Sequence, residues 1–535
     1  NISILGLFFQ KICLINAYYN KKRLFGVNMH TKIYSESLYG IDGIPIIIEV
    51  NISEGLPKFD VVGLPDQAVN EAKERVIAAI NNSGRFFPPK RITINLAPAD
   101  IKKAGSLYDL AFALGILSSS AQIFFDDSME KTIILGELAL DGSVREVKGI
   151  FSMLLNAKEN GIKSAIIPLK NLEEADIVEG LNLYPVKNLK EAIDSIEGKK
   201  SPIISKGKFN FKEDEEENID FSDVKGQEYA KRAAMIAAAG GHNFIMIGSP
   251  GCGKTLIAKR IPTILPPLTF EEALEVTKIY SSYGLLSKNM PIVKKRPFRI
   301  PHHTSSYVSL VGGGRNIKAG EITLAHNGVL FLDEFVEFQS SALQTLREPM
   351  EERVITISRA NGSISFPANF TLIAAMNPCP CGYYGDEKHI CRCSEMTRKR
   401  YIAKLSGPIL DRIDISIEVR AVDYNKMIGK CDGESSASMR NVVIDARKKQ
   451  EKRFKENGLK IFSNALMGIK ETQKFCIMDD KAKNLLNLAI EKFSMSARSY
   501  DKILKVSRTI ADLEDKDIIG IEHITEALQY RFNLN

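Results

Sequence analysis

A glycine-rich segment at residues 248–255 constrains the fold of this chain more than any other feature of its sequence. The segment reads GSPGCGKT, follows a short apolar run at 243–247 and precedes a stretch with the spacing of a helix. A strand, a G-x-x-x-x-G-K-T loop and a helix in this order are typical of a phosphate-binding loop. The glycines let backbone N–H groups surround phosphate oxygens, and the helix N-terminus adds the positive end of its dipole. The segment therefore predicts an α/β domain with a nucleotide site at this loop.

The residues of this phosphate loop have distinct expected roles. Lys254 is expected to reach the β- and γ-phosphates, and the hydroxyl of Thr255 is expected to ligate Mg²⁺. Cys252 lies inside the loop, where we expect its alkylation to block nucleotide binding although it has no catalytic role. The other residues predicted to bind nucleotide here are Gly248, Ser249, Pro250, Gly251 and Gly253.

A second apolar run ends in two carboxylates. Residues 328–335 read GVLFLDEF, which predicts a buried parallel strand with Asp333 and Glu334 at its C-terminal end. Open α/β sheets bind their ligands at that end. Asp333 is therefore expected to hold Mg²⁺ through water, and Glu334 to polarise the attacking water. The alternative is a surface acidic pair, which the phosphate loop upstream argues against.

Three more polar residues belong to the predicted catalytic group. Asn377 directly follows the apolar run at 370–376, so it is placed to orient the attacking water. Arg412 lies between two aspartates, and Arg498 lies at the start of an amphipathic pattern at 496–513, from which an arginine can reach a nucleotide. For each arginine, a surface ion pair is the alternative interpretation.

Four cysteines crowd into one short loop, 377–394, in the pattern C-x-C-x₉-C-x-C. Thiolates suit Zn²⁺, and two pairs joined by a short loop can close a tetrahedron. We therefore predict a zinc site; redox thiols or metal-free cysteines are the alternatives, and His389 is a possible substitute ligand. The predicted ligands are Cys379, Cys381, Cys391 and Cys393.

Basic residues lie in and after this cysteine loop, namely Arg392, Arg398, Lys399 and Arg400. Either they touch nucleic-acid phosphates, or the loop is only a structural staple. A second polar insertion contains His302 and His303. A metal site there would need a third ligand that we cannot identify, so we interpret it as a structural or nucleotide-responsive loop.

Composition and pattern divide the chain into five segments. Residues 1–28 lack the features of a signal peptide, and we interpret them as translated upstream sequence or an unusual extension. The polar, acidic stretch at 201–220 indicates a linker. Alternating strand and helix patterns predict an α/β domain at 29–200 and a parallel-sheet core at 221–425. The helical pattern at 426–535 predicts a small lid.

Within the first α/β domain, apolar runs and helical spacing predict individual elements. The predicted strands cover 44–52, 90–99 and 164–169, with a strand pair at 132–144 joined by Asp141 and Gly142. The predicted helices cover 66–82, 106–120 and 149–160.

The overall composition excludes several classes of protein. Of the 535 residues, 44% are hydrophobic and 26% are charged, which excludes a mostly disordered chain. No uncharged apolar run is long enough to cross a membrane. Eight cysteines are too few for a secreted disulfide scaffold, and their cluster predicts metal in a reducing, cytoplasmic compartment. The net charge of +7 permits an anionic partner without demanding one.

Several longer segments accompany these motifs. They are DVKGQ at 223–227, RPFRIPHHTSSYVSLVGGG at 296–314, GEITLAHNGVLFLDEF at 320–335, LREPMEERVITISRA at 346–360 and NPCPCGYYGD at 377–386. In this order they resemble an AAA+ ATPase, and more narrowly the Mg-chelatase-like ComM/YifB family. The resemblance covers the chain from about residue 30 to its end.

The resemblance implies a nucleotide-dependent hexameric ring with ATP and Mg²⁺ as cofactors. It identifies Asn377 as sensor 1, Arg412 as an arginine finger acting on the neighbouring subunit, and Arg498 as sensor 2. Studied members of the family are DNA helicases that drive branch migration during natural transformation. The resemblance therefore implies single-stranded or branched DNA as the partner.

The amino-terminal domain is similar to the Lon protease domain. The similarity is carried by GELALDGSV at 136–144 and NGIKSAIIP at 160–168. It puts the nucleophile position at Leu107 and the lysine position at Phe151 or Met153, residues that cannot perform this chemistry. Ser106 is adjacent but has no evident base. We therefore predict a proteolytically inactive relative, kept for packing or partner binding.

Three functions stay open on this reasoning. The first is a motor that remodels DNA by helicase action or branch migration, which the basic balance, the KKRPFR stretch at 294–299 and the family resemblance favour. The second is a metal-insertion motor of the Mg-chelatase type, against which the Lon-like domain and the cysteine loop argue. The third is a regulatory ATPase that acts on a protein partner.

Overall fold

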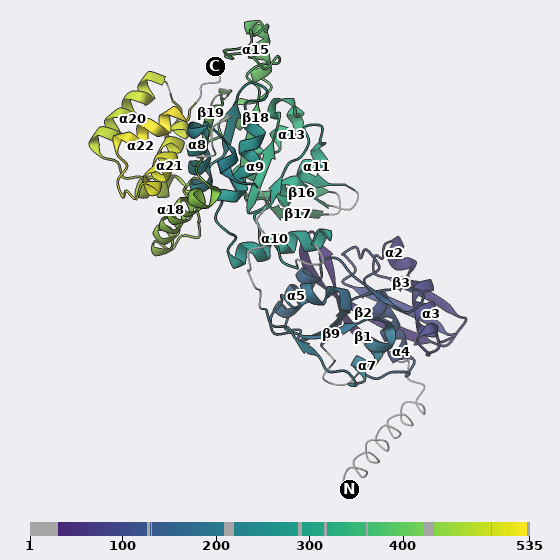
Figure 1. Ribbon diagram of the computed structural model, residues 1–535. Helices are drawn as coiled ribbons and strands as arrows, with labels where there is room; N and C mark the ends of the chain where they lie inside the picture. The colour runs from purple at the N-terminus through teal and green to yellow at the C-terminus, as the bar shows by residue number, and fades with distance from the viewer. Residues whose placement is uncertain are drawn as a thin grey trace. The chain divides into compact units, whose positions relative to one another are not determined.

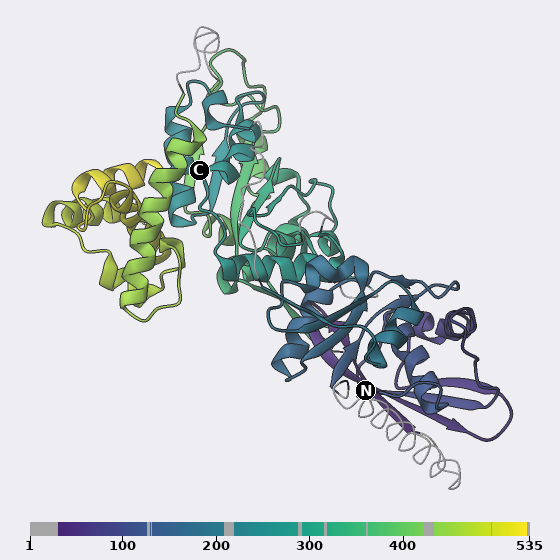
Figure 2. The ribbon, with the colours of Figure 1, turned by 60° about the horizontal axis from the view of Figure 1, so that its bottom comes forward.

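The computed structural model describes residues 30–125, 129, 131–207, 219–286, 291–314, 318–359, 362–421, 433–493 and 495–531. The predicted extension at 1–28 and residues 208–218 of the predicted linker lie outside these ranges. The chain forms two compact units, Asn1–Asn210 with Tyr280–Ile292, and Phe211–Ile279 with Val293–Asn535 (Figure 1, Figure 2). Each unit is built on a sheet of its own.

The first unit contains an eight-stranded mixed sheet in the order β10-β9-β8-β5-β1-β2-β4-β3. At its centre, β1 (His30–Tyr39) and β2 (Asp42–Ser53) form a long antiparallel pair, and β4 (Arg91–Ala97) pairs antiparallel with β2. The other strands of the sheet are β3 (Lys58–Val62), β5 (Thr132–Ile134), β8 (Ser164–Pro168), β9 (Asn182–Val186) and β10 (Ile203–Ile204).

Helices pack on the β1–β2 pair of this sheet. α4 (Asp109–Ser119) is buried along nearly its whole surface and approaches β2 closely. Gly115 makes this approach possible, because a Cβ there would lie 2.6 Å from Val50 Cγ2. The other helices of the unit are α2 (Gln67–Asn70), α3 (Ala72–Asn82), α5 (Ile150–Glu159), α6 (Leu172–Ala175) and α7 (Leu189–Ile196).

Most elements predicted for this unit are confirmed, two of them with corrections, and several observed elements were not predicted. The predicted strand pair at 132–144 is partly wrong: β5 pairs with β8 in the main sheet, whereas β6 (Glu137–Leu138) and β7 (Val144–Arg145) form the hairpin. The helix predicted at 66–82 is divided at Glu71 into α2 and α3. The sequence did not predict β1, because it lacks a long aliphatic run.

The second unit contains a five-stranded parallel sheet in the order β12-β15-β18-β11-β19. Its central strands are apolar and buried, as expected where helices cover both faces of a parallel sheet. The predicted parallel-sheet core is therefore confirmed. The strands are β11 (Phe244–Ile247), β12 (Phe298–Arg299), β15 (Gly328–Leu332), β18 (Phe370–Met376) and β19 (Ile415–Glu418).

Helices from two parts of the second unit cover this sheet. α9 (Lys254–Ile264) contacts β15 and β18, and α8 (Glu228–Gly240) contacts β19. The predicted helical lid is present as α18 (Ser436–Glu456), α19 (Ile469–Phe475), α20 (Asp480–Phe493), α21 (Ala497–Leu513) and α22 (Ile521–Gln529). α18 contacts both α8 and α9, and α21 contacts α8, so Figure 1 shows the lid beside that part of the core.

Further elements connect the strands of the second unit. They include α10 (Phe270–Tyr283), whose residues from Tyr280 onward belong to the first unit. The others are α11 (Tyr307–Val311), α12 (Glu321–Leu324), α13 (Ser340–Gln344), α14 (Arg347–Glu352), α15 (Glu395–Ile402), α16 (Gly407–Leu410), and the pairs β13 (Gly312–Gly313) with β14 (Lys318–Ala319) and β16 (Val354–Arg359) with β17 (Gly362–Pro367). Within the described ranges, no helix combines the length and the apolar character needed to cross a membrane.

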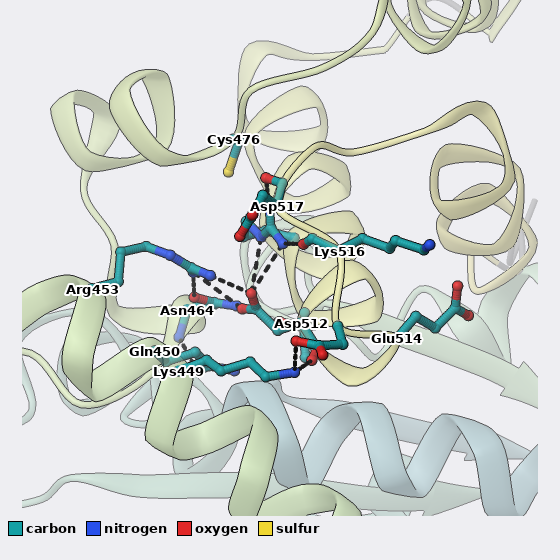
Figure 3. Close-up of polar contacts among 12 residues, drawn as sticks. Lys449, Gln450, Arg453, Asn464, Cys476, Asp512, Glu514, Lys516 and Asp517 are labelled. Carbon is teal, nitrogen blue, oxygen red and sulfur yellow. Dashed lines mark hydrogen bonds and ion pairs between the residues drawn. The ribbon is translucent and has the colours of Figure 1, made fainter.

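A buried carboxylate joins the lid helices (Figure 3). Asp512 on α21 is 1% exposed and accepts hydrogen bonds from Arg453 of α18, from Asn464 at 2.8 Å and from Arg508 Nε at 3.2 Å. Arg508, also 1% exposed, donates to the backbone carbonyls of Lys516 and Asp517. Since every charge in this group has partners, the network fixes α18 against α21.

Candidate active site

The phosphate loop follows the C-terminal end of β11, the strand that lies between β18 and β19 in the sheet. Gly251 and Gly253 have φ angles of +80° and +96°, which are strained for residues with a Cβ. A Cβ at Gly248 would lie 2.2 Å from the carbonyl oxygen of Val419. These three glycines are therefore required by the path of the loop, and the helix α9 begins directly after it.

Lys254 lies folded into the loop that precedes it. Its Nζ donates hydrogen bonds to the carbonyl oxygens of Gly248 at 2.7 Å and Ser249 at 2.9 Å. It also donates to the side-chain oxygen of Asn377 at 3.3 Å. Asn377 follows β18, the strand next to β11, so the sheet brings the predicted lysine and asparagine together.

The predicted magnesium ligands are in direct contact. The hydroxyl of Thr255 donates a hydrogen bond of 2.8 Å to Asp333 Oδ2, and the backbone N–H of Glu334 donates one of 3.0 Å to Asp333 Oδ1. A hydroxyl and a carboxylate are oxygen ligands of the kind Mg²⁺ prefers. These residues therefore fit a magnesium ion beside the phosphate loop.

Glu334 has an unusual backbone and a partner that the sequence did not predict. Its φ and ψ angles are +52° and +46°, in the left-handed region, and its side chain is 53% exposed. Oε2 of the carboxylate lies 2.9 Å from Nδ1 of His303. The histidine comes from the insertion that follows β12, a strand that lies next to β15 in the sheet.

Gln227, in the DVKGQ segment, also contacts the phosphate loop. The sequence did not predict this contact. Its side-chain amide donates to the carbonyl of Cys252 in the phosphate loop at 3.3 Å and to that of Arg420 at 2.7 Å. Gln227 also lines a pocket of about 380 Å³ together with Tyr229 and Glu418. Gln227 therefore connects this pocket to the phosphate loop through its contact with Cys252.

The two predicted arginines meet at one carboxylate that the sequence did not single out. Arg412 Nη2 lies 2.5 Å from Glu351 Oε1, and Arg498 Nη2 lies 3.9 Å from the same oxygen. The Arg412 side chain is only 10% exposed, whereas that of Arg498 is 63% exposed. Among the contacts of the described residues, neither arginine touches the phosphate loop.

The four cysteines of the loop 377–394 lie together. Their Sγ atoms are all within 4.8 Å of one another, and the separations of Cys379, Cys381 and Cys391 are 3.3, 3.6 and 3.7 Å. A tetrahedron of thiolates at about 2.3 Å from Zn²⁺ has S···S distances of about 3.8 Å. The group therefore fits zinc, and His389 instead contacts Asp386, with Nδ1 3.1 Å from Oδ1.

The thiols of this group differ in their acidity. Hydrogen bonds from backbone N–H groups, that of Tyr383 first, lower the pKa of Cys381 to about 6. Burial raises the pKa of Cys379 to about 12. The thiolate is the form that binds a metal, so Cys381 is ready to ligate, whereas Cys379 must release its proton on binding.

The cysteine loop also rests on the phosphate loop. A Cβ at Gly382 would lie 2.7 Å from Pro250 Cδ. Asp386 accepts a hydrogen bond from the side chain of Ser249, and this bond, together with those from the backbone N–H groups of Lys388 and His389, lowers the pKa of Asp386 to about 2. The predicted zinc loop is thus part of the wall around the predicted nucleotide site.

The basic residues next to the cysteine loop extend into α15. Arg392, Lys399 and Arg400 are exposed, and the Arg398 guanidinium lies over the ring of Tyr384 at 4.2 Å. Ile390 at the tip of the loop is 91% exposed. In Figure 1, α15 projects from the sheet of its own unit, and its cationic and aromatic side chains offer contacts of the kind that bind nucleic acid.

The residues considered for proteolysis lie in the first unit. Phe151 and Met153 are buried in α5, and Leu107 packs against the core. Ser106 donates a hydrogen bond to the carboxylate of Glu137. Lys103 Nζ donates to the carbonyl of Pro98. A lysine does not contact Ser106 among the described residues, and the absence of proteolytic activity stays a prediction.

Comparison with known proteins identifies three matching family models. The model described as "Magnesium chelatase, subunit ChlI" matches residues 220–427, and "Subunit ChlI of Mg-chelatase" matches residues 48–171. "Magnesium chelatase, subunit ChlI C-terminal" matches residues 433–531.

Individual relatives match over most of the chain. The sequence is 42% identical over 506 residues to competence protein ComM of Haemophilus influenzae, which covers 93% of this chain and 97% of that protein. It is 41% identical over 501 residues to the uncharacterized protein YifB of Escherichia coli, covering 93% and 96%. A shorter match, 25% identical over 229 residues, joins 43% of this chain to 22% of the DNA replication licensing factor mcm6 of Dictyostelium discoideum.

Proposed function

Because the chain belongs to the Mg-chelatase-like ComM/YifB family of AAA+ ATPases, we propose that it is a ring-forming motor that remodels DNA. It hydrolyses ATP, and Mg²⁺ accompanies the nucleotide, as in AAA+ ATPases generally. The finer activity that we propose is helicase action or branch migration, in recombination or natural transformation. The observation that carries the ATP site is the 2.8 Å hydrogen bond between Thr255 and Asp333, two residues far apart in the sequence.

Each site residue has a role in this proposal. Lys254 holds the β- and γ-phosphates, after exchanging its bonds to loop carbonyls for bonds to phosphate oxygens. Thr255 and Asp333 hold Mg²⁺, which offsets the charge on the phosphates. Glu334 polarises the attacking water, and Asn377 orients it. The contact of Asn377 with Lys254 supports this arrangement, because it keeps the amide beside the terminal phosphates.

In the proposed ring, the adjacent subunit supplies a further positive charge at the ATP site. An arginine from the adjacent subunit offsets charge that develops on the transferred phosphoryl group. We assign this role to Arg412. We assign to Arg498 the contact that the lid makes with the nucleotide. Both arginines pair with Glu351 within one chain, so each must exchange that carboxylate for a phosphate when the ring assembles around ATP.

The proposed DNA contact lies at the cysteine loop and α15. Its support is the exposed cationic side chains Arg392, Lys399 and Arg400 beside a group of thiols that fits zinc. The names of two relatives, a competence protein and a DNA replication licensing factor, agree with DNA as the partner. Contacts of this kind neutralise phosphates and carry little sequence preference.

A metal-insertion motor is the second candidate, because the matching family models are those of a magnesium chelatase subunit. The ATPase rate separates the two candidates when it is measured alone and with branched DNA, a porphyrin or an unfolded protein. The DNA motor predicts stimulation by DNA only. Stimulation by porphyrin or by protein, with none by DNA, contradicts it.

A further inference from the structure

A cavity of the second unit lies at the edge of the five-stranded sheet away from the phosphate loop. Its core wall includes Gly328 and Phe370, the first residues of β15 and β18, and Gly241, which precedes β11. Its lid wall includes Arg447 of α18 and Ser463. The phosphate loop follows the opposite, C-terminal end of β11. The cavity therefore lies where the core and the lid meet, and it is separate from the proposed ATP site.

Charged side chains line this cavity, and positive charge is in excess. The charged lining residues are Arg296, Arg353, Arg447, Glu272 and Glu451. Arg296 Nη2 lies 2.8 Å from Glu272 Oε2, so these two charges offset each other. Among the described residues, neither Arg353 nor Arg447 forms an ion pair with a carboxylate, that of Glu451 included. Two positive charges therefore remain against one negative charge.

Backbone carbonyl groups hold these two guanidinium groups in place. Arg353 Nη1 donates a hydrogen bond of 2.9 Å to the carbonyl oxygen of Phe370. Arg447 donates to the carbonyl oxygens of Phe462 at 3.1 Å and Ala238 at 2.8 Å. The Nε of Arg447 is enclosed and has no hydrogen-bond partner in the described part of the chain. A carbonyl oxygen orients a guanidinium group without cancelling its charge, so both arginines still lack an anion.

The pKa values of both arginines reflect this missing counter-charge. Burial first, and then the charge of Arg296, lower the pKa of Arg447 to about 10. Burial also lowers the pKa of Arg353. A cation whose pKa falls on burial is poorly compensated by its surroundings. An anion in the cavity would compensate both charges.

The size and the polar groups of the cavity fit a phosphate group. Its volume is about 90 Å³, and one water needs about 10–15 Å³ of such space, so it has room for several waters or one small oxyanion but not for a nucleotide. Guanidinium groups bind phosphate oxygens through strong, charge-assisted hydrogen bonds. Thr371 and Ser463 also line the cavity, and neither hydroxyl group bonds to another described residue. These hydroxyl groups can donate to further phosphate oxygens.

We propose that this cavity binds a phosphate group, as inorganic phosphate or as the end of a small phosphorylated molecule. Arg353 contributes from the core and Arg447 from the lid, so the bound anion ties the lid to the core. The inference goes beyond the proposed function, because its ligand is neither the ATP at the phosphate loop nor DNA. It holds whether or not the motor acts on DNA.

The experiment measures binding of inorganic phosphate by isothermal titration calorimetry at constant ionic strength, with sodium chloride as the reference. The full chain is first saturated with Mg²⁺ and a non-hydrolysable ATP analogue, so that phosphate cannot enter the phosphate loop. Lys254→Ala, which removes the lysine of that loop, is titrated as a second background. Inorganic phosphate is expected to bind in both.

Two variants of the cavity change the binding in opposite directions. Arg353→Gln is expected to weaken phosphate binding about tenfold, since it removes charge-assisted hydrogen bonds. Glu451→Gln is expected to strengthen it about threefold, because it removes the remaining negative charge. Arg440→Gln is the matched control: Arg440 also lies on α18 and donates to a core carbonyl, that of Thr263, but it does not line the cavity.

A titration with glycerol 3-phosphate distinguishes the two sources of the phosphate group. Tighter binding than that of inorganic phosphate supports a phosphorylated molecule as the ligand, and weaker binding supports the free ion. If neither phosphate binds beyond chloride, the inference is overturned, and equal affinities of wild type, Arg353→Gln and Glu451→Gln overturn it as well. Should Arg353→Gln fold poorly, Glu451→Gln still decides, because no described residue bonds to the carboxylate that it replaces.

Discussion

Gly382 of the cysteine loop packs against Pro250 of the phosphate loop so closely that a Cβ on Gly382 would lie 2.7 Å from the proline Cδ. The hydrogen bond between Asp386 and Ser249 is a second link between the same two loops. A proline ring in a tight loop cannot move aside without moving the loop. The group of four thiols and the proposed ATP site are therefore coupled mechanically.

Gly382→Ala is expected to weaken ATP binding about tenfold, because the new methyl group pushes on the phosphate loop. Gly385→Ala is the matched control. Both glycines have a left-handed φ, +86° and +79°, but a Cβ at Gly385 would meet only Glu418 Oε1 at an ordinary 3.6 Å. Equilibrium titration with a fluorescent ATP analogue measures the difference. Equal affinities of the two variants contradict the coupling of the loops.

Removal of metal tests the same coupling from the other side. Protein purified without added metal is expected to contain about one zinc per chain, since the four thiols fit one tetrahedral ion. A chelator that extracts it is expected to weaken ATP binding, and zinc to restore it. Elemental analysis and thiol titration check the first expectation. Purified protein that contains no metal, has four freely titrating thiols and binds ATP normally contradicts both expectations.

The lid network predicts a large loss of stability on removing its central carboxylate. Asp512→Ala leaves Arg453 and Arg508 without a counter-charge in a buried place, which is expected to cost about 3–5 kcal/mol. Asp445→Ala is the matched control, because its ion pair with Lys448 on α18 is exposed and is worth about 0–1 kcal/mol. Thermal unfolding of the two variants measures the difference. Similar unfolding temperatures would show that the network contributes little.

The buried carboxyl group of Glu36 is expected to make the stability of the first unit depend on pH. It is 1% exposed, one carboxyl oxygen lacks a partner, and burial raises its pKa from 4.5 to about 8. Between these values the folded chain holds a proton that the unfolded chain has lost. The stabilisation is therefore complete below pH 4.5 and is lost as the pH rises through about 8.

Glu36→Gln is expected to flatten this dependence. From pH 5.5 to 7.5 the wild type is expected to lose up to about 2.7 kcal/mol more than the variant. Hydrogen exchange of the amides in β1 and β2 measures the local free energy of opening. Parallel pH profiles for wild type and variant contradict the assignment.

The sequence predicted the parts of the site that a continuous motif specifies. Lys254, Thr255 and Asp333 follow apolar runs that become parallel strands, and parallel strands bring their C-terminal ends to one edge of the sheet. Glu351 and His303 were not predicted as partners, because their contacts depend on how insertions fold back over the sheet. The spacing of residues along the chain contains no signal for such contacts.

The same limit explains why the sequence did not predict β1. β1 contains Ser35, Glu36 and Ser37, all buried, in place of the aliphatic residues that usually indicate a central strand. It lies in the middle of the sheet because it pairs with β2 along its whole length. The tertiary pairing, and not the local preference, fixes this strand.

Separation of strands in branched DNA tests the central claim most directly. The measurement compares wild type, Glu334→Gln and Lys254→Ala on the same labelled substrate, with ATP. The account predicts that wild type separates strands, that both variants do not, and that wild-type binding to the DNA weakens steeply as salt rises. A wild-type protein that hydrolyses ATP but neither binds the DNA at low salt nor separates its strands contradicts the account.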